Sequence, residues 1–158
     1  MADGQWGRSR SLISHKPSTI HTMPEKTFKL EIVTPERVVL TQDAVSLVVP
    51  AAEGYLGVLA DHAPLIAELT VGEIRVRDAE GRETRLATSG GFMDVRDNTV
   101  HILADTAERA EEIDIARAEE ARKRAEERVR SRAAGINYAR AEAALKRALN
   151  RLRLARGQ

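Results

Sequence analysis

The amino-acid composition changes abruptly near Thr106, and this change constrains the fold more than any other feature. Before it, apolar residues alternate with polar ones, and turn-forming residues interrupt them every few positions. From Ala107 to Arg156 the chain is largely Ala, Glu, Arg and Leu, with a single Gly and no Pro. Period-two alternation predicts half-buried strands, whereas a tract of this composition predicts helix. The sequence therefore predicts an α+β protein, with a strand-built domain over residues 24–106 and a helical domain over residues 107–158.

The strand-like part contains several alternating apolar segments. Their apolar members are Phe28, Leu30 and Ile32, then Val45, Leu47 and Val49, then Ile74 and Val76, then Val100 and Ile102. Turn signals separate them, including Thr34-Pro35, Gly90-Gly91 and Asp97-Asn98. Many short strands at this spacing favour an antiparallel sandwich or barrel, with one face of each strand in the core.

The helical part predicts two helices. Small and apolar residues recur three or four positions apart in two runs, so each run forms one face of a helix. The runs are Ala118, Ala121, Ala125 and Val129, then Tyr138, Ala141, Leu145, Ala148, Leu152 and Ala155. Between them, Gly135 is a candidate C-terminal cap and Asn137 a candidate N-terminal cap. A short link predicts an antiparallel hairpin. Because each alanine buries little area, we expect a weakly held hairpin that is free to open.

Charge is unevenly distributed over this hairpin. Residues 105–127 hold nine acids and five bases, whereas residues 128–158 hold nine bases and only Glu142 as an acid. Such a helix can be an ordinary solvated surface, or a basic helix that binds an acidic protein surface. RNA is a third possible partner, but the stretch lacks the aromatic residues that stack on bases.

The remaining composition excludes several classes of function. A net charge of +1 gives no overall attraction to nucleic acid or membranes, and the absence of Cys suits a reducing cytoplasm. No apolar run approaches the ~20 residues that span a bilayer. There is no phosphate-binding P-loop, no marked acid–base pair and no pair of His residues at metal-ligand spacing, so we predict neither a catalytic residue nor a metal site. His101 alternates with strand residues and is predicted at the sandwich surface. Residues 1–23 are polar and without periodicity, which predicts a disordered leader.

Three segments, in this order and at these distances, resemble the epsilon subunit of bacterial F-type ATP synthases. The first runs from Pro50 to Leu65 and holds a Gly54-x-x-Gly57 turn followed by His62-Ala63-Pro64-Leu65, with Ala60 where the family usually has Pro. The second is Ser89-Gly90-Gly91-Phe92 together with Ala104-Asp105-Thr106-Ala107. The third, Ile113-Asp114-Ile115-Ala116-Arg117-Ala118, opens the hairpin. The resemblance extends from about Phe28 to Leu154.

The resemblance implies a sandwich of about ten strands followed by two helices. It implies a non-catalytic rotor subunit in the central stalk, which couples proton flow to ATP synthesis and inhibits ATP hydrolysis through its C-terminal helices. The implied partners are the gamma subunit, the c-ring and the alpha and beta subunits, at the cytoplasmic face of the bacterial plasma membrane, with membrane contact only through the complex. Interface residues are expected at Glu53, Tyr55 and Gly57, which face the ring, at His62 near gamma, and at Arg128, Arg140 and Lys146.

In some members of this family the third segment begins a regulatory ATP-binding site. The matching residues here are Glu108, Ile113, Asp114, Arg117, Ala118 and Arg124 on the first helix, and Arg147 and Arg151 on the second. Arginines from two helices could converge on phosphates, while Asp114 or Glu108 accepts a hydrogen bond from the adenine amino group. Simple ion pairing on the helix surface, such as Glu108 with Arg109, is the alternative. No hydrolysis is implied.

Two other functions remain open from the residues alone. A free-standing nucleotide-sensing or adaptor module with a basic helical arm would have the same domains, but would not need the central turn motif. An RNA-binding protein would use the basic second helix.

Overall fold

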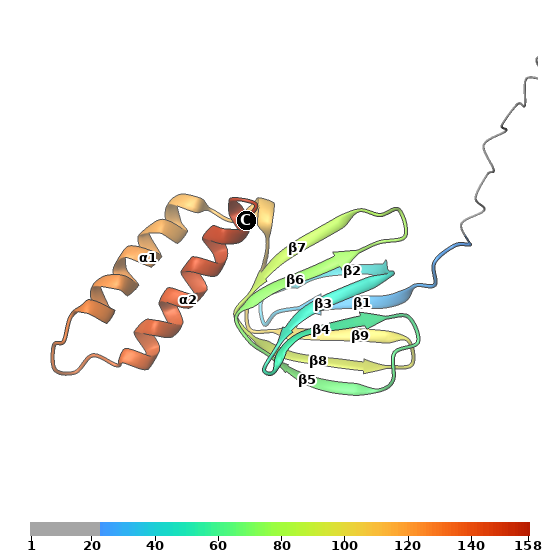
Figure 1. Ribbon diagram of the computed structural model, residues 1–158, viewed down its shortest axis with the longest axis horizontal. Helices are drawn as coiled ribbons and strands as arrows, with labels where there is room; N and C mark the ends of the chain where they lie inside the picture. The colour runs from blue at the N-terminus through green and yellow to red at the C-terminus, as the bar shows by residue number, and fades with distance from the viewer. Residues whose placement is uncertain (1–22) are drawn as a thin grey trace, which may run out of the picture.

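The computed structural model describes residues 23–158, so the predicted leader lies outside the described residues except for Met23. Ten strands come first and two helices last (Figure 1). The strands are β1 (Phe28–Val33), β2 (Val38–Ala44), β3 (Ser46–Ala51), β4 (Gly54–Leu59), β5 (Leu65–Leu69), β6 (Gly72–Arg77), β7 (Glu83–Thr88), β8 (Gly91–Arg96), β9 (Thr99–Ala104) and β10 (Ala107–Arg109). A short 3-10 helix, η1 (Ala110–Glu112), leads into α1 (Ile115–Arg130) and α2 (Tyr138–Ala155). The predicted α+β class is confirmed.

The strands form one hydrogen-bonded network in the order β10-β7-β6-β3-β5-β8-β9-β1-β2, with β4 paired to β3. The pairs are antiparallel, as predicted, except that β1 runs parallel to β9, where Leu30 lies opposite Val100. This exception arises because β1 and β9 are far apart in sequence, so no tight hairpin forces them to run in opposite directions.

The core lies between the two layers of the folded sheet. Every apolar member of the predicted alternating segments is buried, and Ile32, Leu47, Ile74 and Ile102 are completely inaccessible to solvent. All but Val45 belong to one apolar cluster, to which each of the ten strands contributes. The period-two prediction is therefore confirmed in β1, β3, β6 and β9, except that Val45 lies in the bend between β2 and β3. His101 lies on the exposed side of β9 as predicted.

The sheet continues past the predicted boundary at Thr106. Ala107, Glu108 and Arg109 form β10 and pair with Thr88, Ala87 and Leu86 of β7. Ala107 is 5% exposed and belongs to the sandwich core. The composition does not reveal this strand because three residues are too few to establish a period.

Both helices begin at a side-chain cap. The side chain of Asn137 accepts a hydrogen bond from the backbone N–H of Arg140 at 3.1 Å, as predicted, and Asp114 caps α1 in the same way. The prediction for Gly135 is wrong. Helix α1 already ends at Arg130 with Ser131 as its C-cap, and Gly135, at φ +90°, lies in the link that follows. Its positive φ serves the turn between the helices rather than the helix end.

The hairpin contacts the sandwich mainly through the C-terminal end of α2 (Figure 1). The two helices pack on each other through small buried residues, namely Ala118, Ala125, Ala141 and Ala148. At the sandwich end, Leu154 is 1% exposed and packs against Ala87 of β7 and Ile113. The link between the helices, residues 131–137, lies at the opposite end, far from the sandwich (Figure 1).

The position of β10 leads to a prediction about truncated chains. A fragment of residues 23–109 should unfold in one cooperative thermal transition, since it keeps all ten strands and the main core. A fragment of residues 23–106 should melt at a lower temperature, because it loses the β7 pairing and the buried Ala107 side chain. Differential scanning calorimetry of the two fragments tests this. Equal melting temperatures would show that β10 adds nothing to the sandwich.

Candidate functional site

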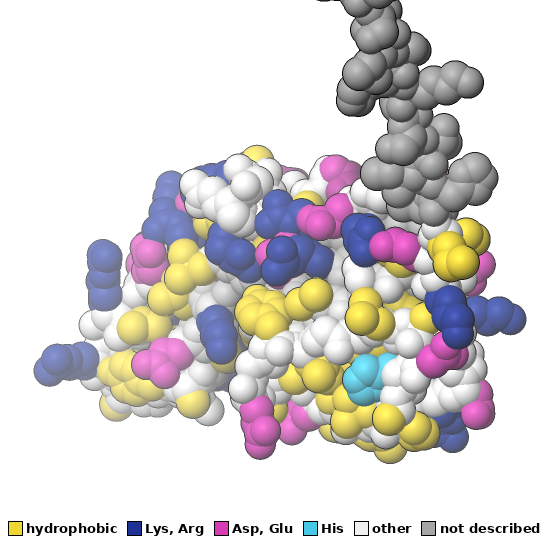
Figure 2. All heavy atoms as spheres, turned by 45° about the vertical axis from the view of Figure 1, so that its right-hand side comes forward, with side chains coloured by type: hydrophobic (Ala, Val, Ile, Leu, Met, Phe, Trp, Pro, Cys, Tyr) yellow, Lys and Arg dark blue, Asp and Glu magenta, His cyan; other side chains and the backbone are white. Residues whose placement is uncertain are grey.

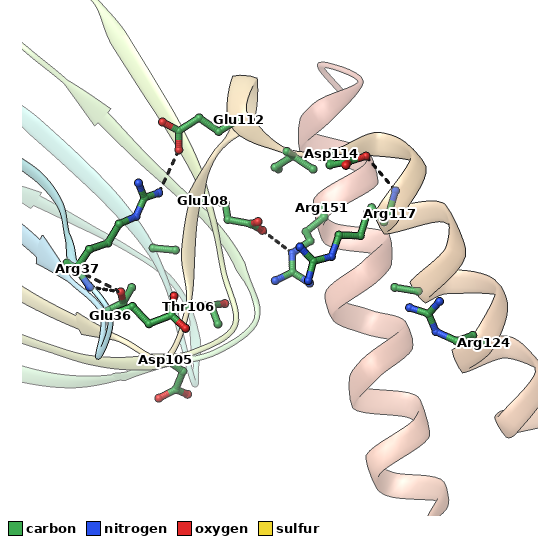
Figure 3. Close-up of a pocket in the computed structure, with 15 residues that line it drawn as sticks. Glu36, Arg37, Asp105, Thr106, Glu108, Glu112, Asp114, Arg117, Arg124 and Arg151 are labelled. Atoms are coloured by element: carbon green, nitrogen blue, oxygen red, sulfur yellow. Dashed lines mark hydrogen bonds and ion pairs between the residues drawn. The ribbon is translucent and has the colours of Figure 1, made fainter.

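A cavity of about 650 Å³ lies between the sandwich and the start of the hairpin. Three parts of the chain line it: the β1–β2 turn with Thr34, Glu36 and Arg37, the β9–β10 segment from Asp105 to Glu108, and the hairpin with its lead-in (Figure 3). The hairpin side contributes Glu112, Ile113, Asp114, Arg117, Ala118, Ala121, Arg124 and Arg151. The cavity therefore exists only while the hairpin lies against the sandwich.

The two walls of this cavity carry net charges of opposite sign, although Arg37 lies on the sandwich wall and Glu112 and Asp114 on the hairpin wall. Figure 3 shows Glu36, Asp105 and Glu108 on the sandwich side, and Arg117, Arg124 and Arg151 on the two helices. One contact bridges the walls, between the Nε of Arg151 and a carboxylate oxygen of Glu108 at 2.6 Å. A second ion pair, at the rim, also bridges the walls and joins Arg37 to Glu112 at 3.2 Å. A ligand that fits both walls needs hydrogen-bond donors at one end and negative charge at the other.

A smaller cavity of about 200 Å³ continues between the helices. It shares Ala121, Arg124 and Arg151 with the first cavity, so the two are neighbours. Its lining consists of four alanines and four arginines: Ala121, Ala125, Ala144, Ala148, Arg124, Arg128, Arg147 and Arg151. Alanines keep the helices close, and the arginines above them make this groove strongly positive.

The structure brings the eight predicted ligand residues to these two cavities. Glu108, Ile113, Asp114, Arg117, Ala118, Arg124 and Arg151 line the first, and Arg147 lines the second. One oxygen of Asp114, Oδ1, is already used as the helix cap, where it accepts from the backbone N–H of Arg117 at 3.0 Å. The placement of Glu108 on the first helix is wrong, because Glu108 lies on β10 of the sandwich. It pairs with Arg151 and not with Arg109, so its ion pair crosses between the domains rather than along a helix surface.

The β1–β2 turn is the part of the cavity that sequence reasoning missed. Glu36 and Arg37 lie about eighty positions before the hairpin motif, and Thr34-Pro35 indicated only a turn. The parallel pairing of β1 with β9 places the end of β1 next to the start of β10, which brings this turn to the cavity. Only the strand order could have revealed these residues.

The predicted partner residues lie on separate surfaces. Glu53 is exposed in the β3–β4 turn, and Tyr55 and Gly57 share the exposed face of β4. His62 lies beyond the other end of β4, with its Nδ1 2.8 Å from the carbonyl oxygen of Ala63. Arg128, Arg140 and Lys146 are exposed on the helices. The structure thus separates the predicted ring-facing residues from His62 by the length of one strand.

An exposed apolar surface on β5, β8 and β9 was not predicted. Ile66 is 70% exposed, Phe92 56% and Leu103 59%. Phe92 lies directly opposite Leu103 on β9, and diagonally from Ile66 on β5. We call these three residues the outer apolar patch. Figure 2 shows hydrophobic side chains gathered on one face of the sandwich, beside a histidine. A contiguous group of exposed apolar side chains marks a protein contact more often than a single exposed apolar side chain does.

Two family models together match nearly all of the described chain. One describes the β-sandwich domain of the ATP synthase delta/epsilon chain and matches residues 27–110, and the other describes the long α-helix domain and matches residues 111–156. The chain belongs to the ATP synthase delta/epsilon family. Membership confirms the family predicted from the three motifs, and with it the role of a non-catalytic rotor subunit.

Two relatives are similar to about two thirds of this chain. The chain is 57% identical over 107 residues to the ATP synthase epsilon chain of Pelotomaculum thermopropionicum, covering 68% of this chain and 79% of that one. It is 54% identical over 109 residues to the epsilon chain of Moorella thermoacetica, covering 69% and 81%. Its fold is similar to that of a chain in the mitochondrial ATP synthase of Euglena gracilis, with a TM-score of 0.68 and 26% identity over 76% of each chain. No helix among residues 23–158 is long and apolar enough to cross a membrane.

Proposed function

We propose that this rotor subunit regulates ATP hydrolysis through a hairpin with two states. In the folded state the hairpin lies on the sandwich and binds ATP. In the extended state it reaches the catalytic head and obstructs rotation. The observation that carries this proposal is the cavity between the sandwich and the hairpin, whose two walls bear opposite charge.

The chemistry of the two walls supports ATP as the ligand. The carboxylates of Glu36, Asp105 and Glu108 can accept hydrogen bonds from the adenine amino group and the ribose hydroxyls. Arg117 and Arg124 offer planar guanidinium groups that suit phosphate oxygens. The groove lined by alanine and arginine adjoins the first cavity at Arg124, and its positively charged side chains could hold the terminal phosphates between the helices. A phosphate that reaches Arg151 has to compete with Glu108 for it.

ATP should bind the folded state alone. Its proposed contacts come from the sandwich, from α1 and from α2, and only the folded hairpin brings these three together. A ligand shifts an equilibrium only by its differential affinity for the two states. At ATP about 100 times Kd, the folded state gains about 2.7 kcal/mol. That is enough to change the predominant state when the two start with similar populations.

The extended state would use other basic residues of the hairpin for a different partner. Arg128, Arg140 and Lys146 are exposed on the hairpin, so they are available to acidic segments of the alpha and beta subunits. Binding there would block the rotor and suppress hydrolysis of ATP when the proton gradient is low. The alanine interface between the helices makes rearrangement inexpensive, because its side chains bury little apolar area.

The sandwich would hold the chain in the central stalk. We assign the outer apolar patch to the gamma subunit, since apolar residues at the centre of a patch are what a stable protein contact buries. His62 precedes β5, which carries Ile66, and belongs to the same contact. The exposed β3–β4 turn with Glu53 would face the c-ring. The complex would place the chain at the cytoplasmic face of the bacterial plasma membrane, with no membrane contact of its own.

Isothermal calorimetry on the isolated chain tests the ATP site. ATP should bind the unmodified chain, and Arg117→Gln combined with Arg124→Gln should weaken binding about 100-fold or more, since each charge-assisted hydrogen bond contributes about 1.5–3 kcal/mol. Lys123→Gln is the matched control: it removes one positive charge from the exposed side of α1, next to Arg124, and should leave the affinity unchanged. Equal affinities in all three proteins would exclude this site.

A further inference from the structure

A buried carboxylate lies where α2 meets the sandwich. Glu73 of β6 is 5% exposed and is surrounded by three guanidinium groups. One carboxylate oxygen accepts a hydrogen bond from Arg85 Nε at 2.5 Å and is 3.8 Å from Arg75 Nε. The other lies 3.4 Å from Arg153 Nη1. Arg75 and Arg85 belong to the sandwich, whereas Arg153 belongs to α2. Glu73 is thus shared between the two domains.

Glu73 is ionised at neutral pH despite its burial. Burial alone would raise its pKa, but the hydrogen bond from Arg85 and the charges of Arg85, Arg153 and Arg75 hold the pKa below its usual value. The three arginines therefore face a full negative charge.

Asn150 joins the same end of α2 to the neighbouring residue of β6. Its Nδ2 donates to the carbonyl oxygen of Gly72 at 2.8 Å, and its Oδ1 accepts from Arg153 Nη2 at 3.1 Å. Gly72 and Glu73, two consecutive residues of one strand, thus both accept from α2. Beside them, Leu154 covers Ala87, the residue directly opposite Glu73 on β7. Polar and apolar contacts converge on one small area.

We infer that Glu73 is the latch that holds the hairpin on the sandwich, so that the folded state is stabilised by the chain itself, without nucleotide. The inference rests on the two-state hairpin proposed above, but not on ATP binding, because neither Glu73 nor Arg153 lines the two cavities. Without the Glu73 charge, the guanidinium groups of Arg75, Arg85 and Arg153 would repel one another. The sign of the electrostatic interaction between Arg153 and the arginines of the sandwich therefore depends on one carboxylate.

The same cluster explains how the latch can open. Removing one partner of a buried ion pair is strongly unfavourable when it leaves the other charge alone. Here Arg85 and Glu73 both belong to the sandwich, so their 2.5 Å contact does not depend on α2. Arg153 passes into water, where it is well solvated. Undocking of α2 thus leaves no buried charge without a partner, and the latch can open and close reversibly.

Thiol labelling measures the undocked state directly. The chain has no cysteine, so Ala87→Cys gives a single thiol, 4% exposed at the parent residue and covered by Leu154 when α2 is docked. Its labelling rate in the isolated chain without nucleotide is proportional to the undocked population, however small. Added to this reporter, Glu73→Gln and Arg153→Gln should each raise the rate about tenfold or more, equivalent to about 1.4 kcal/mol. Asp94→Asn, which removes a carboxylate paired with Arg96 on β8, should not change it.

The two latch variants control for each other. Losing the negative charge of Glu73 would by itself make a nearby thiol more reactive, and losing the positive charge of Arg153 would make it less reactive. Faster labelling in both variants therefore reports undocking, whereas a faster rate in Glu73→Gln alone, or in neither, overturns the latch. Excess ATP should slow labelling of all proteins. If both variants label faster but ATP has no effect, the latch stands and the proposed ATP regulation fails.

Discussion

Complexes assembled with Phe92→Asp are expected to lose this chain. Phe92 lies at the centre of the outer apolar patch, between Ile66 and Leu103, and we assign this patch to the gamma subunit. An aspartate there would be buried in the contact without a partner, at a cost of about 3 kcal/mol or more. That corresponds to binding roughly 100-fold weaker. Because Phe92 is 56% exposed, its replacement should leave the sandwich itself folded.

Purification of the complex through a tag on another subunit measures this loss. The chain should be present in stoichiometric amount in the unmodified complex and nearly absent with Phe92→Asp. Val38→Asp is the matched control, since Val38 is 59% exposed on β2, outside the patch. The circular dichroism of both isolated variants should match that of the unmodified chain. If the Phe92→Asp chain were fully retained in the complex, the gamma contact would have to lie on another face of the sandwich.

Removal of residues 110–158 is expected to release ATP hydrolysis by the assembled complex. The sandwich with β10 remains, so the shortened chain should still join the complex, but no helix can reach the catalytic head. Hydrolysis should rise about tenfold where the extended hairpin occupies roughly nine-tenths of the complexes. The dependence of the inhibition on ATP concentration should disappear at the same time.

Steady-state hydrolysis by purified complexes tests this second expectation. A chain that keeps its hairpin but carries Arg128→Gln, Arg140→Gln and Lys146→Gln should show a smaller rise, because it loses charge but not the helices. ATP synthesis driven by a proton gradient should persist in the complexes with either altered chain. That result would separate the inhibition of hydrolysis from the coupling function. An unchanged rate of ATP hydrolysis after removal of the hairpin would contradict the proposed inhibition by the extended hairpin.

The strands and helices were predictable because their signals are local. Alternation in Phe28, Leu30 and Ile32 reflects the period of a strand with one buried face, and Asn137 caps a helix through its own side chain. The same locality explains the failure at Gly135, whose positive φ suits a helix end and a later turn equally well. The short strand β10 carries too few residues for any period.

The candidate site was predictable mainly on its hairpin side, and Glu108 was the one sandwich residue in the predicted set. Arg117 and Arg124 are spaced to share a face of α1, and Arg147 and Arg151 a face of α2, whereas their assignment to one ATP site came from the family resemblance. Arg37 reaches the cavity only through the parallel pairing of β1 with β9, which no local pattern encodes. Glu73 has the alternation of an ordinary strand residue, and its three arginines come from β6, β7 and α2. Contacts between distant segments depend on the finished topology.

Attachment at a single end also has a mechanical consequence for a rotating subunit. The 18 residues of α2 span about 27 Å at 1.5 Å per residue, and Asn150, Arg153 and Leu154 hold only the last turns. A push on the link between the helices therefore acts on these contacts with a lever arm of more than 20 Å, by the same rise per residue. A modest force at the tip produces a large torque at the base. Collision with a neighbouring subunit could thus detach the hairpin during rotation, whereas a pull along its axis would meet all the base contacts at once.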